Sequence, residues 1–143
     1  MATIAIHPVL RRSLRHYRGE PSTYAVRYRR GRRVAAGPGL AFWFRPLAAA
    51  IVEVPVDDRD VELLVRSRSS DFQDVVASGT VTYRVAEPET LASRVDCTVD
   101  LATGAWRSTP LEQLAGLVTR LAQQQAGGWL QGTPLDRILV EGV

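Results

Sequence analysis

The 143-residue sequence contains no lysine and no asparagine, and it has only one cysteine and two histidines. With Cys97 alone, the chain can form no intrachain disulfide and no cysteine-based zinc cluster. Its longest uncharged apolar stretch is the 11 residues 34–44, which Gly37-Pro38-Gly39 interrupts. A spanning helix needs about 20 largely apolar residues. The apolar start at 4–10 also precedes the arginines, the reverse of a secretory signal, so we expect neither a spanning helix nor a cleaved leader.

All 18 basic residues are arginine, which indicates a GC-rich coding sequence, and they are distributed unevenly. Residues 1–45 carry ten arginines and one acid, a net charge of +9. Residues 46–143 carry eight arginines and 14 acids, a net charge of −6. This asymmetry predicts that the N-terminal part faces a polyanion, an anionic surface or the acidic part of another copy.

Composition and pattern predict two parts of unequal size. The hydrophobic and charged fractions, 45% and 23%, are those of an ordinary globular protein, and the length is that of one domain. Residues 1–22 form a short basic, amphipathic pattern in which Leu10, Leu14 and Tyr17 alternate with arginines. We expect this leader to be a solvated tail or a segment that lies on anionic lipid, followed by a folded domain over 23–143.

Period-two patterns and turn residues predict five or six strands, most of them before residue 85. The clearest strand is 75–85, and Arg30-Gly31-Arg32, Gly37-Pro38-Gly39 and Asp57–Asp60 are expected turns. The other expected strands cover 24–28, 40–44, 50–56 and 61–65, with a further strand or hairpin over 97–106.

Helical signals dominate from Pro88 onward. A two-turn helix is expected at Pro88, and Thr109-Pro110-Leu111-Glu112 is a capping box that starts a longer one. Gly127-Gly128 is expected to end that helix, and Thr133-Pro134 to start another. The predicted fold class is α+β: a twisted antiparallel or mixed β-sheet with packed helices and a helical C-terminus.

No motif for catalysis, metal or cofactor binding stands out. His7 and His16 both lie in the leader, where a rigid site cannot be built. Cys97 fits a small packed residue in a strand, and the glycines near residue 37 fit no phosphate-binding loop. We therefore expect no enzymatic activity, no cofactor and no metal, while a nucleophilic role of Cys97 stays open as a hypothesis.

The order of motifs resembles the stomatin/prohibitin/flotillin domain, called the SPFH or band 7 domain. The resemblance is carried by Tyr28-Arg-Arg-Gly-Arg, then Gly37-Pro-Gly-Leu and Phe42-Trp-Phe-Arg-Pro46. It continues in the segment 76–89, VASGTVTYRVAEPE, and in the closing segments 111–126 and 133–139. It covers about 120 residues from Tyr24 onward, and the order and spacing of the pieces make it specific.

The resemblance implies a non-enzymatic, membrane-associated scaffold that assembles into large homo-oligomers and regulates neighbouring membrane proteins. Members of this family usually reach the membrane through an N-terminal apolar or acylated segment and continue into a coiled coil. In this sequence a basic leader stands at the start and the chain stops at Val143. We expect a cytoplasmic protein, peripheral to the inner face of the membrane, whose native full-length form is a homo-oligomer, whether this chain is a piece of it or a short family member.

Ten residues are the expected contacts with an anionic membrane or a partner. They are the arginines of the leader and of the first turn, with two aromatic residues of the strand that follows: Arg11, Arg12, Arg15, Arg18, Arg29, Arg30, Arg32, Arg33, Phe42 and Trp43. An Arg-rich nucleic-acid-binding module is the alternative, since arginines and tyrosines interleave over 24–33. Alternation on a strand would separate the tyrosines from Arg27 and Arg29, which disfavours nucleic acid as a partner.

Overall fold

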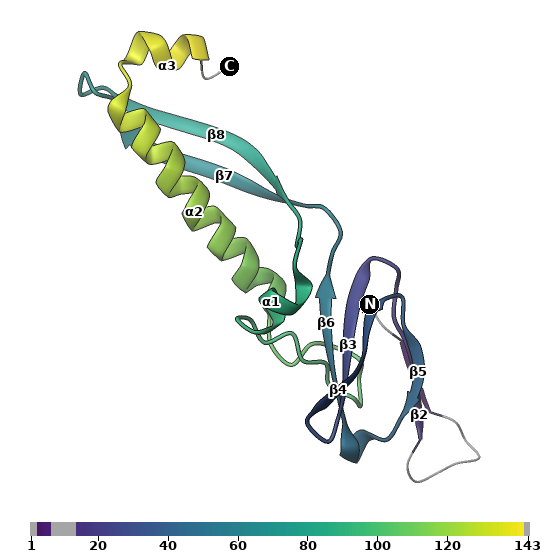
Figure 1. Cartoon of the computed structure of the whole chain (residues 1–143). Coiled ribbons are helices and arrows are strands. Elements are labelled where there is room, and N and C mark those ends of the chain that lie inside the picture. Colours follow the sequence, from purple (N-terminus) through teal and green to yellow (C-terminus); the bar gives the residue numbers. More distant parts are fainter. Residues whose placement is uncertain (1–2, 7–13, 142–143) are drawn as a thin grey trace. The chain divides into compact units, whose positions relative to one another are not determined.

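The computed structural model describes residues 3–6 and 14–141, which form two compact units. Unit 1 spans Met1–Asp58 and Arg84–Leu111, and unit 2 spans Arg59–Tyr83 and Glu112–Val143. Figure 1 labels all of their elements except β1 and η1. In chain order these are β1 (Thr3–Ile6), β2 (Arg15–Arg18), β3 (Thr23–Arg29), β4 (Arg32–Pro38), β5 (Ala41–Phe44), η1 (Pro46–Ala48), β6 (Ala49–Pro55), β7 (Arg59–Arg68), β8 (Asp74–Tyr83), α1 (Pro88–Ala92), α2 (Pro110–Gly132) and α3 (Leu135–Glu141).

Unit 1 contains two three-stranded antiparallel sheets, with strand orders β1-β2-β5 and β4-β3-β6. The far edge of β6 is extended by the segment around Cys97: Glu53 donates its N–H to the Cys97 carbonyl, and Val99 donates to the Ile51 carbonyl. The predicted hairpin over 97–106 is present as a single bridge between Val99 and Trp106.

The predicted leader takes a different form from the one its pattern indicated. Arg15–Arg18 is a strand, and it pairs with β1 on one side and β5 on the other. Tyr17 is fully buried, so this part of the leader is packed into unit 1 and is not a solvated tail. Arg11 and Arg12 lie outside the described residues.

The two sheets of unit 1 pack against each other through one apolar cluster. Tyr17 and Phe44 from the β1-β2-β5 sheet contact Ala25 and Ile51 from the β4-β3-β6 sheet, and all four are buried. Burying a large apolar side chain stabilises a fold by roughly 1.5–3 kcal/mol. The cluster therefore fixes how the pair of strands β2 and β5 packs against β3 and β6.

The β3–β4 hairpin turns at Arg30 and Gly31, as the sequence predicted. Both residues have positive φ, 51° and 77°, which is the geometry of a tight hairpin turn whose twist matches the strands. Glycine adopts this region without strain, whereas a residue with a Cβ does so at a cost of about 1–2 kcal/mol. Arg30 is therefore an unusual residue for its position.

Helix α1 belongs to the outer part of unit 1 and lies near β6. Its Glu89 carboxylate accepts a hydrogen bond from the Tyr24 hydroxyl at 2.9 Å and pairs with Arg33. The predicted helix at Pro88 is confirmed, with Pro88 in its first turn, but at five residues it is shorter than the expected two turns.

Unit 2 contains the β7–β8 hairpin together with α2 and α3. The strands pair over their full ten residues, from Arg59 opposite Tyr83 to Arg68 opposite Asp74, and β7 is longer than the predicted 61–65. Inward-facing residues alternate with exposed ones along both strands. Val65, Leu130 and Ile138 form the buried core of this unit.

Helix α2 starts at Pro110 as predicted, but it does not end at Gly127-Gly128. It continues to Gly132, because Ala126 and Leu130, on either side of the two glycines, both pack into the core of unit 2. This tertiary burial outweighs the low helix propensity of glycine. The second helix start at Thr133-Pro134 is confirmed by α3.

The predicted α+β class and helical C-terminus are confirmed. All strand pairs among the described residues are antiparallel, and they form three small sheets rather than one. Within 3–6 and 14–141, no helix has both the length and the apolar character needed to cross a bilayer.

The glycines inside α2 lead to a stability prediction. A Cβ built at Gly127 or Gly128 would meet no atom within 4 Å, so alanine fits both positions. We expect each of Gly127→Ala and Gly128→Ala to raise the free energy of unfolding by about 1 kcal/mol, because alanine is the better helix former. Urea unfolding followed by circular dichroism measures the change.

Gly31→Ala is the matched control, since Gly31 also has open space around it but has φ at 77°. It should lower stability by about 1–2 kcal/mol. Loss of stability on Gly128→Ala would show that α2 is interrupted at the glycines.

Candidate functional site: an arginine-lined hollow

Arginines from β3, from the β3–β4 turn and from the end of β5 line one hollow in unit 1. Arg27 and Arg29 lie two residues apart on β3 and so share one strand face. Arg30 follows in the turn, and Arg45 comes directly after β5. Packing of β5 against β3 through the core brings Arg45 to the arginines of the β3–β4 hairpin.

These four arginines line a hollow of about 260 Å³. Its lining residues include no acidic side chain, and the hollow belongs entirely to unit 1. The remaining lining residues come from β5, η1, the start of β6 and the residue before β2: Trp43, Phe44, Ala48, Ala49 and Leu14. The hollow is therefore an apolar and aromatic surface surrounded by guanidinium groups.

Arg27 is the most enclosed of the four arginines. Its guanidinium carbon lies 4.7 Å from the centre of the Phe42 ring, a distance at which the ring face attracts a cation. Its Nε atom is buried and has no hydrogen-bond partner among the described residues. A buried donor without an acceptor costs about 1–3 kcal/mol, so Arg27 would gain from an acceptor in the hollow.

Arg30 is held beside the hollow by a strained backbone. Its φ of 51° is in the left-handed region, and its N–H donates to the Ala48 carbonyl at 3.0 Å. Strain of this kind persists where the surrounding structure over-determines it, and it is concentrated at functional sites. The conformation thus singles out Arg30 among the arginines of the hairpin.

Two large apolar side chains are exposed at or next to the lining residues: Trp43 lines the hollow, and Leu47 precedes the lining residue Ala48 in the chain. Trp43 is 46% exposed and packs its ring edge against His16, with 4.9 Å between ring centres. Leu47, in η1 between Arg45 and Ala48, is fully exposed. Exposed apolar groups beside a charged surface are typical of protein or membrane contact sites.

The structure brings together three of the ten predicted contact residues, Arg29, Arg30 and Trp43. Phe42 does not line the hollow itself. Its ring is half-buried, stacks on Tyr17 with 4.8 Å between ring centres, and contacts the guanidinium of the lining residue Arg27.

The other predicted arginines lie elsewhere. Arg33 pairs with Glu89, and Arg32 is exposed on β4 outside the hollow. Arg15 donates to the Leu101 carbonyl. Arg18 lines a different hollow, of about 760 Å³. Glu20 lines the same hollow, so its lining carries both signs of charge.

Arg27 and Arg45 line the hollow but were not among the contact residues expected from the sequence. For Arg27 the signal was present, because the period-two pattern placed it on the same face as Arg29. The error lay in expecting that face to be free of aromatic residues. The aromatic partner, Phe42, comes from β5, and only the packing of the two sheets reveals it.

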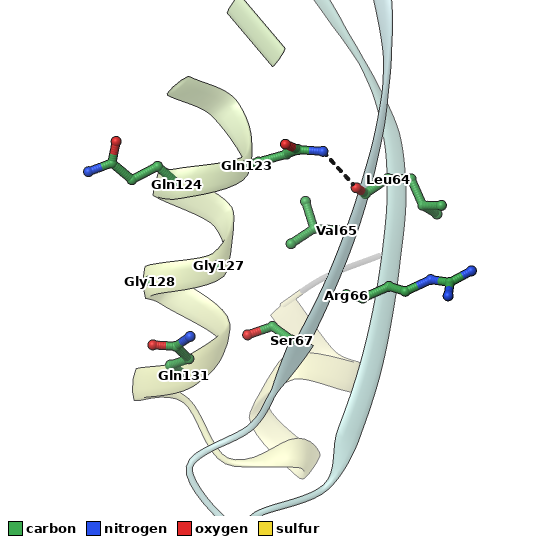
Figure 2. Close-up of a pocket in the computed structure, with 9 residues that line it drawn as sticks. All are labelled: Leu64, Val65, Arg66, Ser67, Gln123, Gln124, Gly127, Gly128 and Gln131. Atoms are coloured by element: carbon green, nitrogen blue, oxygen red, sulfur yellow. Dashed lines mark hydrogen bonds between the residues drawn. The ribbon is translucent and has the colours of Figure 1, made fainter. Parts of the chain in front are cut away.

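Unit 2 has a hollow of its own, of about 570 Å³, between β7 and α2. Figure 2 shows Val65 and Ser67 pointing toward α2, whereas Arg66 points away. Gln123 Nε2 donates to the Leu64 carbonyl at 3.2 Å, and Gly127 and Gly128 leave the space open (Figure 2). Among the described residues, no charged group points into this hollow. Its polar groups are the side-chain amides of the glutamines and the hydroxyl of Ser67.

Cys97 is buried, and burial raises the pKa of its thiol to about 11. The thiol is therefore protonated at neutral pH, whereas a nucleophile needs the thiolate. The packing interpretation of Cys97 fits this environment. Among the described residues, no three His, Cys, Asp or Glu side chains are grouped so as to hold a metal ion.

Glu53 and Tyr17 form a buried acidic pair in the core of unit 1. Burial raises the pKa of the Glu53 carboxyl, and the neighbouring Tyr17 hydroxyl only partly opposes this. Burial, together with the charge of Glu53, also raises the pKa of Tyr17. Glu53 Oε1 and the Tyr17 hydroxyl have no hydrogen bond of good geometry among the described residues, so the charged carboxylate is a cost to the fold.

A comparison with protein families matches residues 17–139 to the SPFH domain / Band 7 family. The chain belongs to this family. The match confirms the resemblance inferred from the motifs and begins seven residues before Tyr24, at the buried Tyr17. No curated protein and no solved structure matches the chain. SPFH-domain proteins are generally membrane-associated, non-enzymatic scaffolds that commonly oligomerise.

The buried carboxyl of this SPFH domain leads to a pH prediction. Because the folded pKa of Glu53 exceeds its ordinary value, the folded state binds the proton more tightly, and stability falls as pH rises from the ordinary value through the raised one. Each unit of difference corresponds to about 1.4 kcal/mol. Glu53→Gln should remove this fall and raise the free energy of unfolding at neutral pH.

Urea unfolding at a series of pH values measures the effect. Glu62→Gln, on an exposed position of β7, is the matched control and should leave the wild-type profile intact. Equal profiles for Glu53→Gln and the wild type would show that Glu53 carries no buried charge.

Proposed function

We propose that this SPFH domain is a non-catalytic scaffold that attaches to the anionic inner face of a membrane through the arginine-lined hollow and assembles with copies of itself. The observation that carries the proposal is the combination of four arginines, with no acid among the described lining residues, and two exposed apolar residues, Trp43 in the lining and Leu47 next to the lining residue Ala48 in the chain. Arginine attracts anionic headgroups, and tryptophan and leucine favour the interface below them.

The energies involved are sufficient for peripheral attachment. Each arginine near an anionic leaflet contributes about 1 kcal/mol. Burial of the exposed side chains of Trp43 and Leu47 would add a favourable term of roughly 1.5–3 kcal/mol for each fully buried residue. Attachment of this kind needs no spanning helix, and it weakens as salt screens the charges.

The nucleic-acid alternative has less support from the geometry. Tyr24, one of the tyrosines expected to stack on bases, donates its hydroxyl to Glu89, and Arg33 pairs with the same carboxylate. These two groups would have to give up a partner before they could bind nucleic acid. The aromatic residue that an arginine does contact, Phe42, lies under Arg27 rather than open to a base.

Co-sedimentation with vesicles tests the attachment. The wild-type chain should bind vesicles that contain phosphatidylglycerol, bind pure phosphatidylcholine much less, and lose binding as salt rises. Arg29→Ser combined with Arg45→Ser should lower the partition coefficient by about tenfold or more, since two contributions of about 1 kcal/mol are removed.

Arg66→Ser combined with Arg68→Ser is the matched control, because it removes the same charge from exposed positions of β7 in unit 2. Equal loss in both double variants would show that total charge, not the hollow, directs attachment. A gel shift of single-stranded DNA that the control keeps and Arg29→Ser/Arg45→Ser loses would favour the nucleic-acid alternative.

The charge asymmetry also predicts how copies associate. If the basic residues 1–45 of one copy dock on the acidic remainder of another, association is electrostatic. Sedimentation velocity should then show species heavier than the 15.7 kDa chain in about 0.1 M salt and dissociation in about 1 M salt, where the screening length falls to about 3 Å. Assembly that strengthens with salt would indicate apolar contacts instead.

A further inference from the structure

We propose that the arginine-lined hollow is a specific binding site for one phosphate group, either the phosphomonoester of a lipid headgroup or free phosphate. The lipid source rests on the proposed function, because only membrane attachment brings a headgroup to the hollow. The phosphate site itself follows from the residues of unit 1 alone. A diffuse basic surface would bind any anionic lipid in proportion to charge. The hollow has features that a diffuse surface lacks.

The first feature is concentrated positive charge without internal compensation. Arg27, Arg29, Arg30 and Arg45 share one hollow, and no carboxylate lines it. Arginine cannot be deprotonated in proteins, so the four groups repel one another at every relevant pH. A group with two negative charges relieves this repulsion more than a singly charged carboxylate or phosphodiester does.

The second feature is the direction from which the donors come. The arginines belong to β3, to the β3–β4 turn and to the end of β5, so the hollow collects guanidinium groups from three separate parts of the chain. A phosphate group offers several oxygens in a tetrahedral arrangement, which suits donors that converge from separate elements. Guanidinium groups bind such oxygens with two parallel hydrogen bonds.

The third feature is an enclosed donor that lacks an acceptor. Arg27 Nε is buried without a hydrogen-bond partner among the described residues, while the face of the same guanidinium is held by Phe42. A phosphate oxygen would supply an acceptor of the kind that Arg27 lacks. At about 260 Å³ the hollow lies below the range typical of drug-sized ligands, which suits a small anionic group.

The fourth feature is the strained backbone of Arg30. Glycine would suit its φ of 51° better, and the next residue, Gly31, shows that the turn accepts it. Arg30 therefore lowers stability at a place where its side chain lines the hollow. A charged residue that lowers stability at this position, where glycine would be more stable, is consistent with a role of its side chain in binding.

Calorimetric titration of the full chain with inorganic phosphate tests the site. We expect saturable binding with one phosphate per chain. Arg30→Gly should weaken it by about tenfold or more through the loss of a charge-assisted contact, while raising the thermal midpoint by several degrees. Arg45→Ser should weaken binding similarly. Arg32→Ser is the control, since Arg32 is exposed outside the hollow, and it should change the affinity by less than about twofold.

Vesicles of phosphatidylcholine with phosphatidic acid, compared at equal charge with phosphatidylglycerol, distinguish the two sources. Preference for phosphatidic acid that Arg30→Gly removes identifies the lipid headgroup. Saturable phosphate binding without this preference identifies free phosphate.

If the chain neither binds phosphate nor prefers phosphatidic acid, the site is overturned, even if anionic vesicles still bind and the proposed function stands. Equal weakening by Arg32→Ser would also overturn it. Conversely, phosphate binding by a chain that sediments with no vesicle would support the site and contradict the membrane attachment.

Discussion

The packing of two small sheets around Tyr17 and Phe44 is the constraint on which the arrangement of unit 1 depends. The arginines of the hollow repel one another, and nothing in their own interactions would gather them. Burial of the apolar cluster, at roughly 1.5–3 kcal/mol for each large side chain, outweighs this repulsion, because exposed like charges at a protein surface cost about 1 kcal/mol or less per pair. Ala25 contributes by being small, so that β3 carries little bulk where it meets Tyr17. The basic site is thus held in place by the core beneath it.

The same sheet face also carries the one buried acid of this core, yet it does not neutralise the arginines. In the register of β3 and β6, Arg27 lies opposite Ile51 and Ala25 lies opposite Glu53, so the two charged residues are diagonal neighbours. Each nevertheless keeps a buried polar atom without a hydrogen bond among the described residues. Glu53 faces Tyr17 instead, and Arg27 rests on Phe42. The positive charge of Arg27 is therefore left for the hollow.

Local sequence patterns predicted the elements whose residues repeat with a clear period or carry caps. Strand β3, the turn at Gly31, α1 and the start of α2 belong to this group, because each is determined by residues close in the chain. Strand β2 was mistaken for part of an amphipathic leader, since its four residues have no period of their own and become a strand only between β1 and β5. The passage of α2 through Gly127-Gly128 likewise depends on contacts with β7. The site was predicted in part for the same reason: Arg29 and Arg30 are adjacent in sequence, whereas Arg45 joins them only through the packing of β5.

The distribution of titratable groups bears on the kind of work this unit can do. Acid–base catalysis needs a group whose pKa lies near the working pH. In unit 1 the buried groups Cys97, Tyr17 and Glu53 all have raised pKa values, and burial is the main cause for each of them. None of them lines the hollow, where the only charged side chains are arginines that keep their charge throughout the physiological range. A site built from permanent charges cannot move protons, but it can hold an anion, and its own charge does not change with pH. Any pH dependence of binding would then come from the second ionisation of the bound phosphate group, which lies near neutral pH.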